Sequence, residues 1–355
     1  ARTLYVFAHA TQQVRGMDVN SNQIQTGGIH MKIIAYEVRE DEREHFDRYT
    51  KEFEIDLLLT EQIPTLDNAS LAAGCDGVTM LGQGKIDSDL LDEYKRLGIQ
   101  CISTRTIGYD HIDLNYAKKI CLPVCNAFYD PNGVAEYTVM LMLLCIRHYK
   151  AALWRAQVND YSLQGLYGRE MRNLTVGILG TGRIGTQVAK LLSGFGCRIL
   201  GFDHHPGKAS QWLTYTDLDT LYQESDIITI HLNLSGQTRH IINQETISKM
   251  KDGVILINCA RGGLMDTDAL IAGIEKKKIG GLGLDCFEHE EGIYHLDRRD
   301  DIISNQSMAY LRQFPNVVMT QHMAFYTDAA VANMVRCGIE GIYSVIMKGG
   351  YPALL

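Results

Sequence analysis

The sequence predicts an α/β fold with two doubly wound parallel-sheet domains. Short β-rich runs alternate with helical segments in two separate series, one starting at Met31 and the other at Leu174. This alternation is typical of parallel sheets that are covered by helices on both faces. The length agrees with two domains, because 355 residues exceed what one small core needs.

Composition narrows the class of protein. Hydrophobic residues make up 46% of the chain, which is ordinary for a soluble protein, and the net charge of −8 disfavours nucleic acid as a partner. The longest apolar run, 139–146, is too short to span a bilayer. The nine cysteines form no Cys-x-x-Cys motif and lie mostly in apolar runs. We therefore expect reduced core thiols, a cytoplasmic protein and no bound metal.

The first thirty residues differ in character from the rest. The apolar run 4–8 is too short for the core of a signal peptide, and residues 25–30, QTGGIH, resemble a linker. Met31 then opens a clear strand pattern. We expect residues 1–30 to be a tag or linker and Met31 to be the natural start.

The first series predicts one domain of alternating strands and helices. The polar segments between its strands have one apolar face, as Leu90, Leu91 and Tyr94 show in the segment 87–97. The predicted strands are 32–38, 55–59, 77–81, 100–104 and 122–126.

A long helix is predicted between the two series, from Gly133 to about Gln157. Its first half, VAEYTVMLMLLCI, is apolar nearly all round, which is typical of a buried helix.

The second series opens with a glycine-rich turn in the context that dinucleotide binding requires. A strand-like run, 174–179, leads directly into GTGRIG, and a helical pattern, a second run at 198–202 and Asp203 follow. The helix start offers N–H groups and a partial positive charge to phosphates. We expect the cofactor to contact the turn at Gly180, Gly182, Arg183, Ile184 and Gly185.

Each glycine of the turn has a physical reason. Gly180 allows the tight turn, Gly182 lets a pyrophosphate approach the backbone, and Gly185 lets the helix pack on the strand. Asp203, 18 residues past Gly185, would accept hydrogen bonds from the adenosine ribose. No Arg follows Asp203 to bind a 2′-phosphate, so we expect NAD rather than NADP.

Four further strands and a final helix complete the second series. The final helix, 328–348, follows the last strand, so we expect it to return to the first domain and make that domain discontinuous. The strands are 226–232, 254–260, 280–285 and 316–320.

Charged side chains follow the last three of these strands. Arg261 follows one strand, Asp285 ends the next with Glu288 and Glu290 just beyond, and His322 follows the last. Open α/β sheets bind ligands at such carboxyl ends. An Arg suits a substrate carboxylate, a His can exchange the alcohol proton, and an acid behind the His favours its protonated form. This set suits oxidation of a 2-hydroxy acid, although periodicity does not choose between Glu288 and Glu290.

The chain from Met31 onward resembles the D-isomer-specific 2-hydroxyacid dehydrogenases, especially the D-lactate dehydrogenase branch that includes the vancomycin-resistance pyruvate reductases. The resemblance implies a flavodoxin-like substrate domain, 31–128 with 327–355, interrupted by a Rossmann dinucleotide-binding domain, 129–326, with catalysis in the cleft between them. The matching segments are STRTIGYDHID (103–113), YDPNGVAEYT (129–138), GILGTGRIG (177–185), NCARGGLMDTDAL (258–270), GLDCFEHEEG (283–292) and TQHMAFYTDAAVANMV (320–335).

The resemblance also implies roles for single residues. Arg261 would anchor the substrate carboxylate and carbonyl, and His322 would be the acid/base. The family spacing places the partner acid five residues past the strand-end Asp, which selects Glu290 over Glu288. One departure is visible, because Gln321 stands where the family usually has Pro.

The remaining implied positions concern the substrate and the cofactor. Ile107 and Gly108 match the loop whose N–H groups hold the substrate carboxylate, and Tyr129 and Phe325 match pocket positions. Asp285 would lie near the nicotinamide. Further positions expected to bind the cofactor are His231, Cys259 and Ala260.

The function so implied is an NAD-dependent D-2-hydroxyacid dehydrogenase that reduces a small monocarboxylic 2-ketoacid, pyruvate or a related apolar one. Candidate pocket segments 81–84, 127–129 and 325–326 contain no cation for a second carboxylate, and Arg105 is the nearest one in sequence. The family commonly forms homodimers through its cofactor domain, and the apolar helix from Gly133 is compatible with that.

Two alternatives stay open. One is a non-catalytic NAD(H)-sensing protein, because the family also contains transcriptional corepressors. The other is a related enzyme with another substrate, such as formate. The formate enzymes pair the His with Gln, and Glu290 argues against them.

Overall fold

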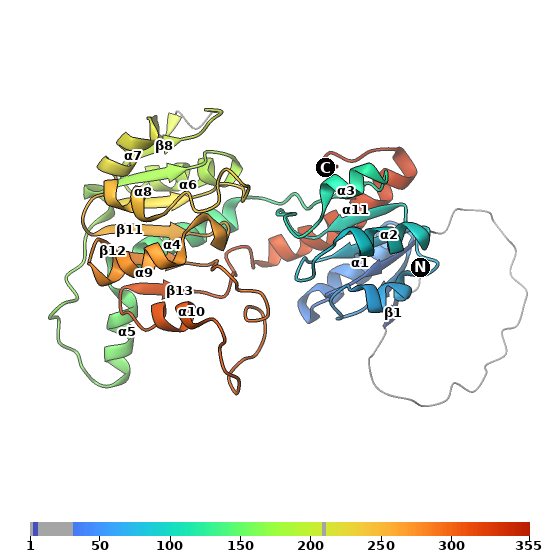
Figure 1. The fold of residues 1–355 in the computed structure, drawn as a ribbon, viewed down its shortest axis with the longest axis horizontal. Helices are drawn as coiled ribbons and strands as arrows, with labels where there is room; N and C mark the ends of the chain where they lie inside the picture. Colours follow the sequence, from blue (N-terminus) through green and yellow to red (C-terminus); the bar gives the residue numbers. More distant parts are fainter. Residues whose placement is uncertain (1–2, 6–30, 208–210) are drawn as a thin grey trace, which may run out of the picture. The chain divides into compact units, whose positions relative to one another are not determined.

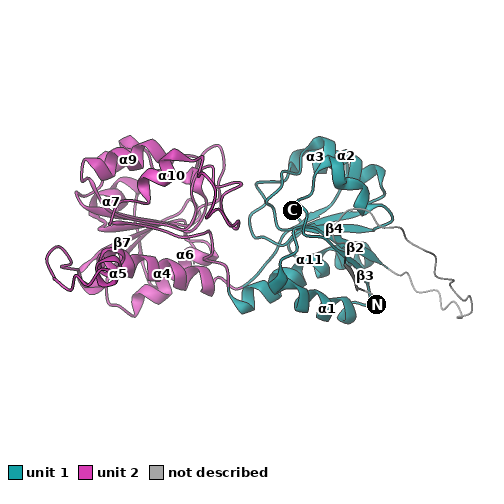
Figure 2. Ribbon diagram, turned by 90° about the horizontal axis from the view of Figure 1, so that it is seen from below, with its two compact units in different colours: residues 1–129, 327–355 teal, residues 130–326 magenta. Residues whose placement is uncertain are grey.

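The computed structural model describes residues 3–5, 31–207 and 211–355, which form two compact units (Figure 1). Unit 1 comprises residues 1–129 and 327–355, and unit 2 comprises residues 130–326. Each unit is a parallel sheet with helices on both faces, which confirms the predicted fold class (Figure 2).

The sheet of unit 1 has the order β1-β3-β2-β4-β5-β6, and all its neighbouring strands are parallel. The chain passes from β2 to β3 on one side and then to β4 on the other, so the switch point lies between β2 and β4. The strands are β1 (Thr3–Tyr5), β2 (Lys32–Ala35), β3 (Asp56–Leu59), β4 (Gly77–Met80), β5 (Cys101–Thr104) and β6 (Val124–Cys125).

Strand β1 belongs to the segment for which the sequence predicted a tag or linker. It pairs in parallel with β3, with Thr3 opposite Leu57, and adds an edge strand that no sequence pattern announced. The rest of that segment, 6–30, lies outside the described residues.

Two layers of helices cover the sheet of unit 1 (Figure 2). Helix α11 packs against β4, β5 and α1. It is long and apolar enough to pass as a membrane span by composition, but more than half of its apolar stretch is buried within the protein, as in a core helix. The helices are α1 (Arg43–Glu52), α2 (Ser88–Arg96), α3 (Leu114–Lys119) and α11 (Asp328–Lys348), with short 3-10 turns η1 (Glu40–Glu42) and η2 (Leu66–Ala72).

The sheet of unit 2 has the order β13-β12-β11-β10-β7-β8-β9, again with parallel neighbours. Its switch point lies between β7 and β10, and β10 and β11 are buried throughout. The strands are β7 (Thr175–Leu179), β8 (Arg198–Phe202), β9 (Thr214–Tyr215), β10 (Ile227–Ile230), β11 (Val254–Asn258), β12 (Ile279–Leu284) and β13 (Val317–Met319).

Helices also cover both faces of this sheet (Figure 2). Helix α4 packs on α6, β11 and β12. The helices are α4 (Asn132–Ile146), α5 (Tyr149–Gln157), α6 (Arg183–Ser193), α7 (Leu218–Glu224), α8 (Gln244–Lys249), α9 (Thr267–Glu275) and α10 (Gln306–Leu311), with 3-10 turns η3 (Met171–Asn173) and η5 (Gly262–Leu264).

Many of these helices begin at a side-chain cap. An Asp, Asn or Thr precedes the first turn, and its side-chain oxygen accepts a hydrogen bond from a backbone N–H that the helix leaves unpaired. The caps of α2, α3, α7, α8, α9, α10 and α11 are Asp87, Asp113, Asp217, Asn243, Asp266, Asn305 and Thr327.

The prediction of one helix from Gly133 to Gln157 is wrong. The chain forms two helices, α4 and α5, because the backbone leaves the helical conformation at His148, whose φ is +50°. The apolar run ends at Ile146, so the following residues have no apolar face to bury, and Lys150 instead donates to the carbonyl of Val317 in β13 at 2.7 Å. Helix α5 accordingly has no buried residue.

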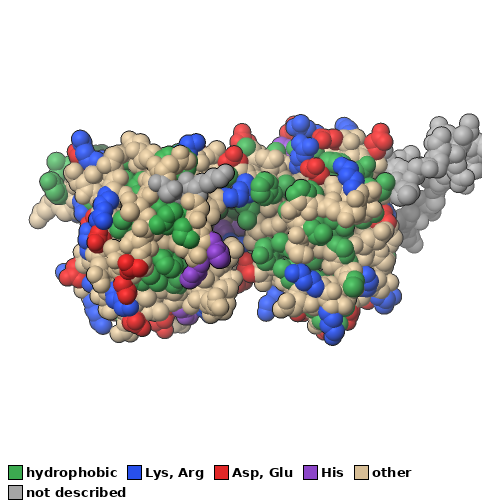
Figure 3. Space-filling model, turned by 90° about the horizontal axis from the view of Figure 1, so that it is seen from above, with side chains coloured by type: hydrophobic (Ala, Val, Ile, Leu, Met, Phe, Trp, Pro, Cys, Tyr) green, Lys and Arg blue, Asp and Glu red, His purple; other side chains and the backbone are tan. Residues whose placement is uncertain are grey.

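Cationic and anionic side chains are interspersed over the face of both units shown in Figure 3.

Candidate active site

The glycine-rich turn joins β7 to α6 beside the switch point of unit 2. Gly180 has φ +88°, and a Cβ there would lie 2.6 Å from the carbonyl oxygen of His231. A Cβ on Gly185 would lie 2.0 Å from the carbonyl oxygen of Gly180, so neither position tolerates a side chain. Beside Gly182, by contrast, no atom lies within 4 Å of a Cβ position. The turn therefore fits a pyrophosphate, with open space at Gly182 and the start of α6 behind it.

Asp203 lies directly after β8. Its carboxylate accepts hydrogen bonds from the N–H and hydroxyl of Thr181, at 2.7 and 3.2 Å, and from the N–H of His205, at 2.9 Å. Burial alone would raise the pKa of Asp203, but these hydrogen bonds hold it below its usual value. The group is thus an anion at neutral pH, which suits ribose hydroxyls and repels a 2′-phosphate.

The other predicted cofactor residues follow neighbouring strands at the same edge of the sheet. His231 follows β10, Cys259 and Ala260 follow β11, and Asp285 follows β12. Burial lowers the pKa of His231 to about 3, so its ring is neutral, and its Nε2 lies 3.0 Å from the hydroxyl of Thr229. Burial also raises the pKa of the Cys259 thiol.

His322 and Glu290 form a close pair. Nδ1 of His322 lies 2.5 Å from Oε1 of Glu290, whose other oxygen accepts the N–H of Phe287 at 2.7 Å. The carboxylate is therefore fixed at both oxygens, and it in turn orients the imidazole ring. Because Nδ1 is engaged, Nε2 is the ring nitrogen that can exchange a proton with a substrate.

Glu288 lies in a different environment. Its carboxylate is 2.7 Å from Nε2 of His240 and accepts hydrogen bonds from the N–H and hydroxyl of Thr267, at 3.2 and 2.7 Å. The structure thus brings Glu290, and not Glu288, to His322.

Asp285 organises the backbone around His322. Its buried carboxylate accepts hydrogen bonds from the hydroxyl of Thr320 at 2.6 Å and from the N–H groups of Met323 and Ala324, at 2.9 and 2.8 Å. Its carbonyl oxygen accepts the N–H of His322 at 2.8 Å. His322 has φ +52°, which residues other than glycine rarely adopt, so these bonds hold it in an uncommon conformation.

Arg261 completes the set in unit 2. Its Nη1 donates to the carbonyl of Ala260 at 2.7 Å, and its own carbonyl accepts the side-chain amide of Asn258 at 2.8 Å. Strands β11, β12 and β13 are neighbours in the sheet, so Arg261, Glu290 and His322 follow three adjacent strand ends.

No sequence pattern singles out His295. Its Nε2 lies 3.1 Å from the carbonyl oxygen of His322, and its ring meets the ring of Phe325 edge to face at 6.2 Å between centroids. Phe325 also meets the His322 ring edge to face, at 6.4 Å. His295 lies in an irregular segment, where neither strand ends nor periodicity predict such a contact.

The predicted substrate residues of unit 1 lie after β5 and β6. The carbonyl of Ile107 accepts the side-chain amide of Asn126 at 2.7 Å, and the carbonyl of Gly108 accepts the hydroxyl of Thr106 at 2.6 Å, which fixes this turn. Tyr129 is buried at the end of the same unit.

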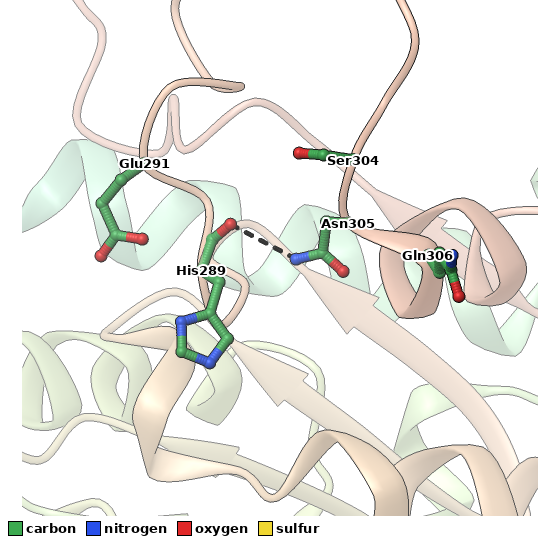
Figure 4. A pocket seen from close by; sticks show the side chains of 5 residues that line it. All are labelled: His289, Glu291, Ser304, Asn305 and Gln306. Carbon is green, nitrogen blue, oxygen red and sulfur yellow. Dashed lines mark hydrogen bonds between the residues drawn. The ribbon is translucent and has the colours of Figure 1, made fainter.

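A separate hollow lies beside the loop 288–291, which follows β12. It measures about 500 Å³ and is lined by His289, Glu291, Ser304, Asn305 and Gln306 (Figure 4). The side chain of Asn305 points to the carbonyl of His289, to which it donates at 3.3 Å. Neither Glu290 nor His322 lines it, so it is distinct from the site above. Among the described residues, no group of three His, Cys, Asp or Glu side chains could hold a metal ion.

Known proteins match this chain over most of its length. The model of the D-isomer specific 2-hydroxyacid dehydrogenase NAD binding domain matches residues 139–324. An aromatic 2-oxoacid reductase of Clostridium sporogenes is 42% identical over 324 residues, 90% of this chain and 97% of that protein. The D-lactate dehydrogenase of Escherichia coli is 33% identical over 322 residues, 90% of this chain and 98% of the other.

Solved structures of the same family also match this chain. A D-2-hydroxyisocaproate dehydrogenase superposes with a TM-score of 0.83 at 31% identity, over 92% of this chain and 99% of its own. The NAD-complexed D-isomer specific 2-hydroxyacid dehydrogenase of Lactobacillus delbrueckii superposes with a TM-score of 0.79 at 32% identity, over 92% of this chain and 100% of its own. The fold and site define an NAD-dependent oxidoreductase. The chain belongs to the D-isomer-specific 2-hydroxyacid dehydrogenases, in their D-lactate dehydrogenase branch.

Proposed function

We propose that this protein uses NADH to reduce a monocarboxylic 2-ketoacid with an apolar side chain to the D-2-hydroxy acid. The observation that carries the proposal is the 2.5 Å contact between His322 and Glu290. It lies at the sheet edge that also carries Arg261 and the glycine-rich turn.

Three side chains of unit 2 divide the chemistry. His322 holds a proton at Nε2 and donates it to the carbonyl oxygen, while Glu290 orients the ring and stabilises the imidazolium. The Arg261 guanidinium pairs with the substrate carboxylate and polarises the carbonyl. The nicotinamide, when bound, supplies the hydride.

Unit 1 contributes the proposed binding groups. The N–H groups of Ile107 and Gly108 bind the substrate carboxylate, and Tyr129 contacts the substrate together with Phe325 of unit 2. We infer that unit 1 is the substrate domain and unit 2 the dinucleotide-binding domain.

The substrate is expected to have a single carboxylate. Arg105, the nearest cation in sequence to the proposed carboxylate loop, is fully buried and pairs with Glu42 at 3.0 Å. It therefore belongs to the core of unit 1, and we do not expect it to bind a second substrate carboxylate. The relatives named as a D-lactate dehydrogenase and an aromatic 2-oxoacid reductase support pyruvate and aromatic 2-ketoacids, respectively.

A panel of 2-ketoacids tests the proposal. NADH oxidation is followed with pyruvate, 2-ketoisocaproate, phenylpyruvate, oxaloacetate and 2-ketoglutarate. One of the three monocarboxylates should give the highest kcat/KM. A preference for 2-ketoglutarate would contradict the single-carboxylate proposal, and no turnover with any of the five would favour an NAD(H)-sensing protein.

We also propose that the protein is a cytoplasmic homodimer joined through unit 2. Helix α5 and the loop after it expose large apolar side chains, with Trp154, Tyr161, Leu163 and Tyr167 exposed by 64, 76, 83 and 93%. Surfaces of this kind mark contacts between proteins. All nine cysteines are free thiols, which is compatible with a reducing compartment.

A further inference from the structure

The buried side chain of Glu37 is bound by backbone N–H groups of its own unit. It is 4% exposed, and its two oxygens accept hydrogen bonds from four successive backbone N–H groups in the loop after β4. Oε2 accepts the first two and Oε1 the last two. The donors are Leu81 at 2.5 Å, Gly82 at 2.6 Å, Gln83 at 2.8 Å and Gly84 at 3.0 Å.

The position of this contact in the sheet is informative. Glu37 follows β2 and the loop follows β4, so the contact lies at the switch point of unit 1. Doubly wound sheets bind ligands at such points, and consecutive N–H groups form an anion-binding concavity. In unit 1 this place is occupied by a carboxylate of the chain itself.

The backbone of Glu37 is held in place by a buried arginine. Its φ is +56°, a conformation that costs free energy for any residue other than glycine. Nη2 of Arg105 donates to the carbonyls of Tyr36 and Glu37, at 2.9 and 3.2 Å. Arg105 also pairs with Glu42 at 3.0 Å, and both side chains are fully buried.

The loop held by Glu37 is linked to the loop that carries Ile107 and Gly108. The N–H of Ile86 donates to the carbonyl of His111 at 2.9 Å, and the N–H of Asp113 donates to the carbonyl of Ile86 at 3.0 Å. Gly82 lies so close to the His111 ring that a Cβ would come within 2.6 Å of it. The two loops are therefore joined by backbone hydrogen bonds and by close packing at His111.

We propose that Glu37 is a positioning residue for substrate binding: it acts as an internal anion that fixes loop 81–84 and, through it, the turn at Ile107 and Gly108. This inference rests on the proposed function, in which that turn binds the substrate carboxylate. An ionised carboxylate is needed because all four partners are donors. An amide at this position would present its own N–H groups to two of them.

Glu37→Gln tests the role by a split between KM and kcat. The KM for the best 2-ketoacid should rise by about ten- to a hundredfold, while kcat and the KM for NADH stay within about threefold. Asp76→Asn is the matched control. Asp76 accepts the N–H of Lys32 at 2.8 Å and the amide of Gln100 at 3.0 Å, but at the opposite end of the same strands. It should lower the Tm without changing either KM.

Amide hydrogen exchange gives a second readout that does not need turnover. Glu37→Gln should speed exchange in both 81–84 and 105–113, and Asp76→Asn in neither. Should Glu37→Gln not fold, Gly82→Ala displaces the same loop against His111 and should raise the same KM. Unchanged exchange and an unchanged 2-ketoacid KM would overturn the role of Glu37. If Glu37→Gln speeds exchange in both loops but the parent protein turns over no 2-ketoacid, the role of Glu37 stands and the proposed function is rejected.

Discussion

At the scale of single residues, we propose that Asp203 determines the choice of cofactor. Hydrogen bonds from Thr181 and His205 keep its carboxylate ionised, so we expect it to accept hydrogen bonds from ribose hydroxyls and to repel a 2′-phosphate. We expect kcat/KM to be much higher with NADH than with NADPH, and Asp203→Ala to narrow the difference. Steady-state kinetics with both cofactors measure this. Equal values in the parent enzyme would contradict the assignment.

Glu288 is predicted to stabilise the fold in a pH-dependent manner. Burial alone would raise its pKa, but contacts with His240 and Thr267 lower it. Because the folded-state pKa lies below the unfolded value of about 4.3, the stabilisation is present above that pH and is lost as pH falls through the folded pKa. Glu288→Gln should therefore cost about 1–3 kcal/mol of stability at pH 7, and this cost should shrink only below about pH 4.3. Thermal melts of both proteins from neutral pH down to about pH 3 check it, and a cost that stays the same below about pH 4.3 would contradict it.

At the scale of elements, two glycines of the glycine-rich turn are expected to have different roles, one in cofactor binding alone and one in folding as well. Gly182 has open space at its Cβ position, whereas a Cβ on Gly185 would meet the Gly180 carbonyl at 2.0 Å. We expect Gly182→Ala to keep the parent Tm but to weaken NADH binding by at least about tenfold.

Gly185→Ala is the comparison variant, and it should lower both the Tm and the NADH affinity, because α6 must move away from β7. Fluorescence titration with NADH and thermal melting distinguish the two variants. Parent-like NADH affinity in Gly182→Ala would contradict the pyrophosphate position.

Local patterns predicted all the strands except β1 and β9, but not where some elements end. The run 32–38 suggested a strand up to Val38, yet β2 ends at Ala35, because Glu37 has a left-handed backbone. His148 breaks the helix after α4 in the same way. The backbone at Glu37 is held by hydrogen bonds from Arg105, 68 residues away, and no local pattern contains such a contact.

At the scale of the whole molecule, the sequence could predict which candidate site residues lie together at the strand ends of one sheet. Arg261, Asp285 and His322 are visible in this way, because parallel strands bring their carboxyl ends to one edge. The choice of Glu290 needed the family spacing, since Glu288 has the same parity. His295 stayed hidden, because only the folding of an irregular loop brings it to His322.

The proposed homodimer is a prediction at the same scale. Sedimentation or light scattering should give twice the chain mass of 39.8 kDa. Trp154→Glu together with Tyr167→Glu should shift the protein towards monomers, because these exposed side chains would then carry charge into the interface. A monomeric parent protein would contradict the dimer.

The pH dependence of 2-ketoacid reduction tests the central claim most directly. In the proposed mechanism, reduction needs a proton on His322, and Glu290, which contacts Nδ1 of that ring, is the anion that stabilises the imidazolium. With Glu290→Gln, activity should therefore be lost at a lower pH than in the parent enzyme as the pH is raised. Glu288→Gln should leave that profile nearly unchanged, since Glu288 contacts His240 and Thr267 instead. A profile moved by Glu288→Gln and not by Glu290→Gln would contradict the proposed acid–base pair.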